Sequence, residues 1–129
     1  MDAIKIMSAH RIGAMAVTSA SNPDNVIGVV TERDYMCKVG YLSKYLSRDD
    51  KNVTVKEICT HGDANLVTVT EDEHVDECMK KLLQRDIRHM LVRGTDGKIK
   101  YLCSVKDLVK CAVDRHEAVI GNMVKNLNL

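Results

Sequence analysis

Two hydroxyl–carboxylate pairs with the same spacing are the residues of this chain best suited to chemistry. Thr31 precedes Asp34 by three positions, and Ser104 precedes Asp107 by three positions. This spacing is typical of a capping box, in which the hydroxyl caps a helix and the carboxylate complements its positive end. The same arrangement places a carboxylate beside free backbone N–H groups, where it can accept ribose hydroxyls next to a bound phosphate. Spacing alone favours the capping role and leaves the ribose site open as the alternative.

Two adjacent side chains that can carry positive charge, Arg88 and His89, interrupt the otherwise apolar segment 87–92. If this segment is a strand, alternation sends one of the two side chains to solvent. The alternative is a phosphate-binding pair, because the planar guanidinium of arginine suits phosphate oxygens. The sequence leaves both interpretations open.

No catalytic or metal site is expected. The five cysteines, at positions 37, 59, 78, 103 and 111, form no C-x-x-C pair and no tight cluster of metal ligands. They are interpreted as reduced thiols, with Cys78 and Cys103 acting as small apolar residues. No nucleophile–base pair and no glycine-rich phosphate loop is found. We therefore expect no enzyme activity, no metal and no cofactor.

Charge and composition exclude two classes of partner. The chain has 19 basic and 18 acidic residues, no Phe, no Trp and four Tyr, so neither a basic field nor a base-stacking surface favours nucleic acid. No apolar run approaches the roughly 18 residues of a membrane span. We expect no nucleic-acid or membrane partner, and an intracellular, reducing location: the cytoplasm, or an organelle if a transit peptide has been removed.

The elements that must position these residues are encoded twice. Segment 3–17 matches segment 78–92 at an offset of 75, and segment 29–35 matches 102–108 at an offset of 73. Repeats of this length indicate two small units that bury a core only together. We predict an α/β fold of two β-α-β-β-α repeats about a pseudo-twofold axis, in which the first repeat lacks its N-terminal strand. The predicted boundaries are 1–50, 51–116 and, for a C-terminal helical tail, 117–129.

Hydrophobic periodicity predicts the individual elements. The first copy is expected to contain a helix over 2–11, strands over 13–18 and 26–31, a helix over 34–45 with Tyr35, Met36, Val39 and Leu42 inward, and a linker over 43–52. The second copy is expected to contain a strand over 66–69, a Thr70–Glu73 capping box opening a helix with Val75, Cys78, Met79, Leu82 and Leu83 buried, strands over 89–93 and 99–103, and a helix over 105–113. The stripe of Ile120, Met123, Val124 and Leu127 predicts that the tail continues as a helix.

Three segments resemble cystathionine-β-synthase (CBS) domains. Segment 27–35 resembles the family's strand-closing signature, segment 87–92 its R-H-x-P-V strand, and segment 53–60 its V-x-D-I-M-T linker. The resemblance covers residues 2 to about 116 and is greatest to small proteins made of one CBS pair. Leu91 stands where the family has proline, Tyr101 and Lys106 stand where it often has glycine, and Cys37 stands where arginine is common.

The resemblance implies a tandem pair, or Bateman module, with two clefts that bind adenosine compounds, here AMP, ADP or ATP. Asp34 would hold the ribose, Thr31 would help to orient the ligand, and the adenine would lie against segment 66–69. The preferred cleft is expected to contain Thr31, Asp34, Leu66, Val67, Val69, Arg88, His89 and Lys106. The weaker cleft is expected to contain Ser104, Asp107 and Arg33, with the uncharged Gly13 and Ala14, a missing strand and a crowding Tyr101.

The resulting hypothesis is a non-catalytic regulatory module that binds an adenine nucleotide and signals to a partner through its conformation. The alternative is a ligand-free CBS pair that serves for dimerisation and protein interaction. A homodimer is expected from the resemblance and from the apolar stripe of the tail. The alternative for the stripe is that it packs back on its own module.

Overall fold

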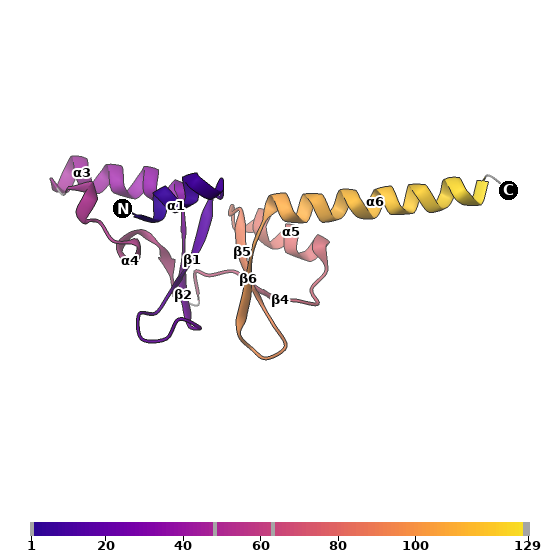
Figure 1. The fold of residues 1–129 in the computed structure, drawn as a ribbon, viewed down its shortest axis with the longest axis horizontal. Coiled ribbons are helices and arrows are strands. Elements are labelled where there is room, and N and C mark those ends of the chain that lie inside the picture. The colour runs from indigo at the N-terminus through magenta and orange to yellow at the C-terminus, as the bar shows by residue number, and fades with distance from the viewer. Residues whose placement is uncertain (1, 48, 63, 128–129) are drawn as a thin grey trace.

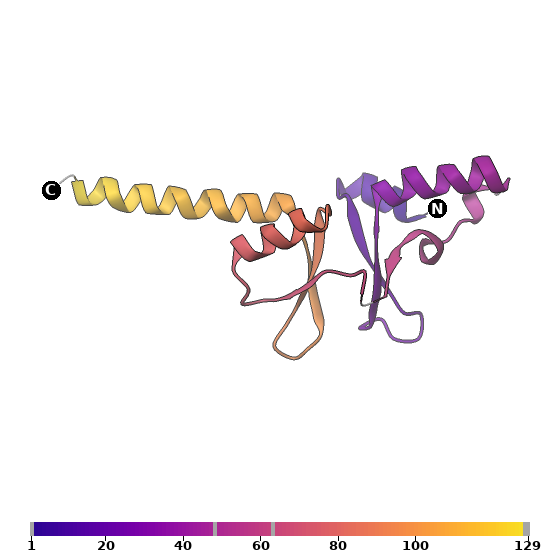
Figure 2. The same ribbon diagram turned by 180° about the vertical axis from the view of Figure 1, so that it is seen from behind.

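The computed structural model describes residues 2–47, 49–62 and 64–127. It shows two small sheets side by side and one long helix that extends away from them (Figures 1 and 2). The first unit contains α1 (Asp2–His10), β1 (Ala14–Thr18), β2 (Val26–Thr31), α2 (Glu32–Asp34), the π-helical turn η1 (Tyr35–Val39), α3 (Gly40–Leu46), the 3₁₀ turn η2 (Asp50–Asn52), α4 (Val55–Ile58) and β3 (Thr60–His61). The second contains β4 (Thr68–Thr70), α5 (Val75–Gln84), β5 (His89–Arg93), β6 (Ile99–Ser104) and α6 (Val105–Leu127).

Strand register confirms the repeat. In the first sheet, of order β1-β2-β3, β1 and β2 are antiparallel and Ala14 pairs with Thr31. In the second sheet, of order β4-β5-β6, β5 and β6 are antiparallel and His89 pairs with Ser104. These are the positions that the sequence offset makes equivalent. The predicted α/β class with two related units is therefore confirmed.

The two sheets differ in the strand that flanks the shared hairpin. In the second unit β4 runs parallel to β5. In the first unit, across the described residues, no strand pairs with the corresponding edge of β1, and β3 pairs instead with the far side of β2. The segment containing β3 was assigned to the second repeat from the sequence. The structure packs Val53, Ile58 and Cys59 of this linker into the core of the first unit.

Three apolar clusters hold the molecule together. Met7, Val30 and Ile58 are among the buried residues of the first unit's core, and Cys78, Leu82, Met90, Val69 and Leu108 form the core of the second. A third cluster joins the two sheets through Ala14, Val29 and Leu91. Burial of apolar surface between the sheets therefore adds to the small core that each unit has of its own.

Three predictions about the elements are wrong: the burial of two side chains, the continuity of one helix and the position of one capping box. Met36 and Leu83 were expected to be buried, but their exposed fractions are 76% and 83%. The predicted helix over 34–45 is interrupted by the π-helical turn η1.

The third wrong detail is the predicted capping box at Thr70–Glu73, which does not open the helix. Helix α5 begins after His74, which provides no side-chain cap. The Glu73 carboxylate is instead 2.9 Å from the ammonium of Lys81 and accepts a hydrogen bond from the His74 N–H. A cation eight positions further along the chain thus binds the carboxylate that the box requires.

The closing helix and the tail form one continuous helix, α6, as predicted. Both views show its C-terminal half projecting beyond the body of the molecule (Figures 1 and 2). The predicted stripe stays exposed, with Ile120 at 58% and Leu127 at 83%, so it does not pack back on its own chain. Among the described residues, no helix combines the length and the apolar character that crossing a membrane requires.

Candidate functional site

A cavity of about 220 Å³ lies where the two units meet. The first unit contributes the ends of β2 and β3, and the second contributes the segment before β4 and the turn that leads into β5. Its lining consists of Val29, Thr31, Arg33, Asp34, Thr60, Asn65, Leu66, Val67, Asp86, Ile87, Arg88 and His89. The cavity therefore combines an apolar wall with carboxylates and cationic side chains.

The Thr31–Asp34 pair forms a complete capping box. Thr31 has extended backbone angles, φ −122° and ψ 162°, which end β2 and start α2. Its N–H and its hydroxyl both donate to Oδ2 of Asp34 at 2.9 Å, and the Asp34 N–H donates to the hydroxyl at 3.1 Å. The predicted capping role is confirmed. Because the same carboxylate also lines the cavity, the cap does not exclude a second role toward a ligand.

The Ser104–Asp107 pair repeats this geometry in the second unit. The N–H and the hydroxyl of Ser104 donate to Oδ2 of Asp107 at 2.8 and 2.7 Å, and the Asp107 N–H donates back at 3.2 Å. The hydrogen bonds from the Ser104 N–H and hydroxyl lower the pKa of Asp107. Neither residue lines the cavity; Asp107 instead borders a groove along α6.

A lysine four positions after Asp34 forms an ion pair with the carboxylate of the first box, which was not predicted from the sequence. The ammonium of Lys38 lies 2.8 Å from Oδ1 of Asp34 and donates to the carbonyl of Ile58 at 2.5 Å. The contact ties the start of the π-helical turn to the linker before β3. Four positions after Asp107 the second unit has Cys111, which cannot form this ion pair.

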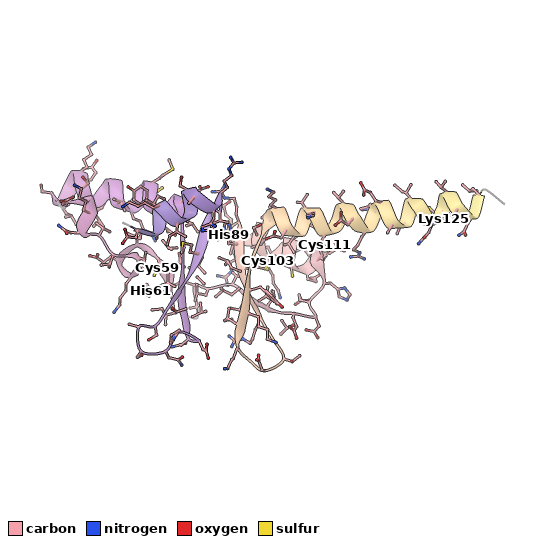
Figure 3. All side chains as sticks on the ribbon, viewed as in Figure 1. Cys59, His61, His89, Cys103, Cys111 and Lys125 are labelled. Carbon is pink, nitrogen blue, oxygen red and sulfur yellow. The ribbon has the colours of Figure 1, made fainter. Side chains whose placement is uncertain are left out.

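Two guanidinium groups provide the cationic side of the cavity, and one imidazole lies beside them. Arg33 and Arg88 are exposed, which leaves them free to turn toward a phosphate. His89 is half-buried at the junction of the units (Figure 3), and its Cε1 would lie 3.7 Å from a Cβ placed on Gly13. Burial, followed by the positive charge of Arg88, lowers the pKa of His89. At neutral pH His89 is therefore mainly uncharged and acts as a hydrogen-bonding group.

Most residues predicted for the preferred cleft lie together in this cavity, namely Thr31, Asp34, Leu66, Val67, Arg88 and His89. Two do not line it: Val69 belongs to the core of the second unit, and Lys106 is exposed at the start of α6. Arg33, which was assigned to the weaker cleft with Ser104 and Asp107, lines this cavity instead.

Several lining residues were missed. Thr60 was within the linker resemblance and could have been found there, because β3 follows that linker directly. Asn65 carried no signal: its position depends on a turn in which its N–H donates to the carbonyl of Gly62 and its amide to that of His61. Asp86 has a positive φ of 50° at the end of α5, a conformation that spacing does not reveal.

The residues expected in the weaker cleft line different hollows, with Arg33 in the cavity, Asp107 beside α6 and Gly13 elsewhere. A hollow beside Gly13 is lined by Ile4, Met7, Ser8, Arg11, Ile12, Gly13 and Glu32. Its lining includes neither Ser104 nor Asp107. Tyr101, expected to crowd this cleft, is 61% exposed on β6.

The profile of the CBS domain family matches two stretches, residues 1–39 and 55–114, and the second stretch begins with α4 and β3. The chain belongs to the CBS domain family. It carries two CBS repeats, and its α/β architecture is that of solved CBS-pair proteins. A CBS-domain protein from Burkholderia ambifaria, solved experimentally, is 36% identical with a TM-score of 0.74, covering 88% of this chain and 75% of that one.

Two further relatives extend the comparison. The mitochondrial CBS domain-containing protein CBSX3 of Arabidopsis thaliana is 32% identical over 115 residues, which are 89% of this chain and 53% of the plant protein. A CBS domain protein from Pyrobaculum aerophilum, solved as a complex with AMP, shares the fold with a TM-score of 0.68 at 23% identity, covering 82% of this chain and 73% of that one. The chain spans about half the length of the Arabidopsis protein.

Proposed function

We propose that this CBS pair is a non-catalytic regulatory module that binds an adenine nucleotide of the AMP, ADP or ATP class. The observation that carries the proposal is that Asp34 of the first unit and Arg88 and His89 of the second line one cavity. A ligand in contact with all three favours one relative orientation of the units, which a regulated partner can then recognise. The AMP complex of the Pyrobaculum aerophilum protein supports the ligand class.

Each part of a nucleotide has a chemically suited part of the lining. Leu66 and Val67 offer apolar surface to the adenine, and the carboxylate of Asp34 accepts a hydrogen bond from the ribose. Arg33 and Arg88 bind phosphate oxygens, and His89 adds a hydrogen bond. Hydrogen bonds to charged groups contribute about 1.5–3 kcal/mol each, so loss of one weakens binding by roughly tenfold or more.

Calorimetric titration of AMP, ADP and ATP into three variants tests the proposal. Asp34→Ala and Arg88→Ala are expected to weaken binding at least about tenfold. Asp107→Ala is the matched control, because it removes a capping box with the same three hydrogen bonds whose residues do not line the cavity. If binding is lost in Asp107→Ala and retained in Asp34→Ala, the ligand does not bind in the cavity that Asp34 lines, and the proposal is wrong.

The exposed stripe of α6 favours a second function, protein interaction through homodimerisation. Val113, Ile120 and Leu127 recur every seven residues and are 48%, 58% and 83% exposed. A seven-residue repeat of apolar side chains is the pattern by which helices pair in coiled coils. We propose that a second copy of the chain covers this stripe. Light scattering at micromolar concentration should give the mass of a dimer, and Ile120→Glu should give that of a monomer; a monomeric wild type excludes this function.

We also propose a reducing compartment for the protein. All five cysteines are free thiols. Burial raises the pKa of Cys59, Cys78 and Cys103. Such thiols stay protonated and unreactive at neutral pH, in keeping with a structural role.

A further inference from the structure

The carboxylate of Asp34 is already largely occupied before any ligand binds. An ionised carboxylate offers about four acceptor positions on its two oxygens. Oδ2 accepts two hydrogen bonds from Thr31, both at 2.9 Å, and Oδ1 has the ammonium of Lys38 at 2.8 Å. By this count one position remains, on Oδ1. A ribose that presents both its 2′ and 3′ hydroxyls needs two.

The Thr31 bonds are fixed by the backbone. One donor is the N–H at the end of β2, and the hydroxyl that forms the other bond also accepts the Asp34 N–H at 3.1 Å. Breaking either bond would open the cap of α2. The two positions on Oδ2 are therefore not available to a ligand.

Lys38 is held in its place by two elements. Its ammonium donates to the carbonyl of the fully buried Ile58 as well as contacting Asp34, whose side chain is only 13% exposed. The π-helical turn η1, in which Lys38 lies, immediately follows Asp34. Turns of this kind are rare and frequent at functional sites. The second unit has neither feature, because α6 is a regular helix there and Cys111 occupies the equivalent position.

We propose that Lys38 is a specificity-determining residue that limits Asp34 to a single ribose hydroxyl. This inference rests on the proposed nucleotide site and names the part of the sugar that the site recognises. One of the two hydroxyls is bound by Asp34, and the other contributes little while the ammonium is in place. Without the ammonium, Oδ1 gains an acceptor position and both hydroxyls are bound.

The test compares AMP with its 2′-deoxy and 3′-deoxy forms by calorimetry, using wild type, Lys38→Met and Lys38→Arg. In the wild type, only one deoxy form should bind more weakly than AMP by over fivefold. In Lys38→Met, both should do so. Lys38→Arg retains the cation and should behave as the wild type.

Ratios between ligands remove effects that are common to all of them. Loss of the lysine charge changes the attraction for phosphate, but it does so equally for AMP and for both deoxy forms. If both deoxy forms bind weakly to the wild type, or if Lys38→Met gives wild-type ratios, the role of Lys38 is refuted while the nucleotide site stands. If no form binds to any of the three proteins, the proposed function fails and this inference fails with it.

Discussion

Replacing Gly28 with alanine tests how closely the linker strand is packed against the first sheet. Gly28 lies on β2 and pairs with His61 of β3. A Cβ at this position would lie 2.7 Å from the carbonyl oxygen of Thr60 and 3.0 Å from Sγ of Cys59. The first of these atoms belongs to the backbone and cannot rotate away. The substitution must therefore push β3 outward, and Thr60 away from the cavity with it.

The expected cost follows from two opposing effects. Overpacking of this kind costs about 1–3 kcal/mol, and replacing glycine restores about 0.4–1 kcal/mol by restricting the unfolded chain. Gly28→Ala should therefore lower the free energy of unfolding by about 1–2 kcal/mol, which is a fall of about 4–8 °C in Tm. Urea and thermal unfolding followed by circular dichroism measure both quantities.

Gly40 supplies the matched control. It lies in α3, and among the described residues no atom beyond the chain neighbours and the backbone of its own helix is within 4 Å of the Cβ that alanine would add. Gly40→Ala should raise stability by about 0.5–1 kcal/mol, because alanine is the better helix former. If Gly28→Ala is as stable as the wild type while Gly40→Ala behaves as expected, β3 is not packed against β2 in the way described.

Two other predictions concern the junction between the units. Leu91→Ala should lower the free energy of unfolding by about 2–5 kcal/mol, because Leu91 is 2% exposed between the sheets, whereas Leu91→Met should cost less than about 1.5 kcal/mol; urea unfolding that gives equal losses would contradict this packing. The lowered pKa of His89 means that the unfolded chain binds its proton more tightly, so His89 stabilises the fold above about pH 6.5 and this contribution falls as the pH drops. The stability difference between wild type and His89→Gln should therefore shrink from pH 7.5 to pH 5.5, and a difference independent of pH would exclude the effect.

The repeat and its capping motifs could be predicted from the sequence because they depend on local chemistry. Thr31 and Asp34 are three positions apart, and a helix N-terminus needs nothing else to form their box. The strand that begins at His89 and its antiparallel partner follow from apolar runs and a turn. For these elements local preference and tertiary structure agree, so pattern alone was sufficient.

The remainder depends on contacts between distant segments. Gly28 and Tyr101 are equivalent in sequence, yet β3 covers the first and leaves the second exposed. A large side chain is accommodated at Tyr101 because, among the described residues, no strand pairs with the outer edge of β6. Tyr101 therefore does not crowd a cleft. Arg33 was expected beside Ser104 and Asp107 but lines the cavity with Asp34. The direction of an exposed side chain at the start of a helix is set by packing between the units, which a local pattern does not contain. The contact of Lys38 with Ile58 spans 20 positions, which no local pattern encodes.

The first residue of α6 is joined directly to the cavity. The N–H of Val105 donates to the carbonyl of Arg88 at 2.9 Å, so the base of the helix is hydrogen-bonded to the backbone of a cavity-lining residue. From this point the helix runs for 23 residues, which at about 1.5 Å per residue is a rod of roughly 35 Å. A stiff rod pivoting at one end magnifies small rotations: a tilt of about 5° at Arg88 displaces the tip at Leu127 by about 3 Å. Geometry alone therefore makes the far end of α6 the place where the smallest movement of the cavity produces the largest displacement.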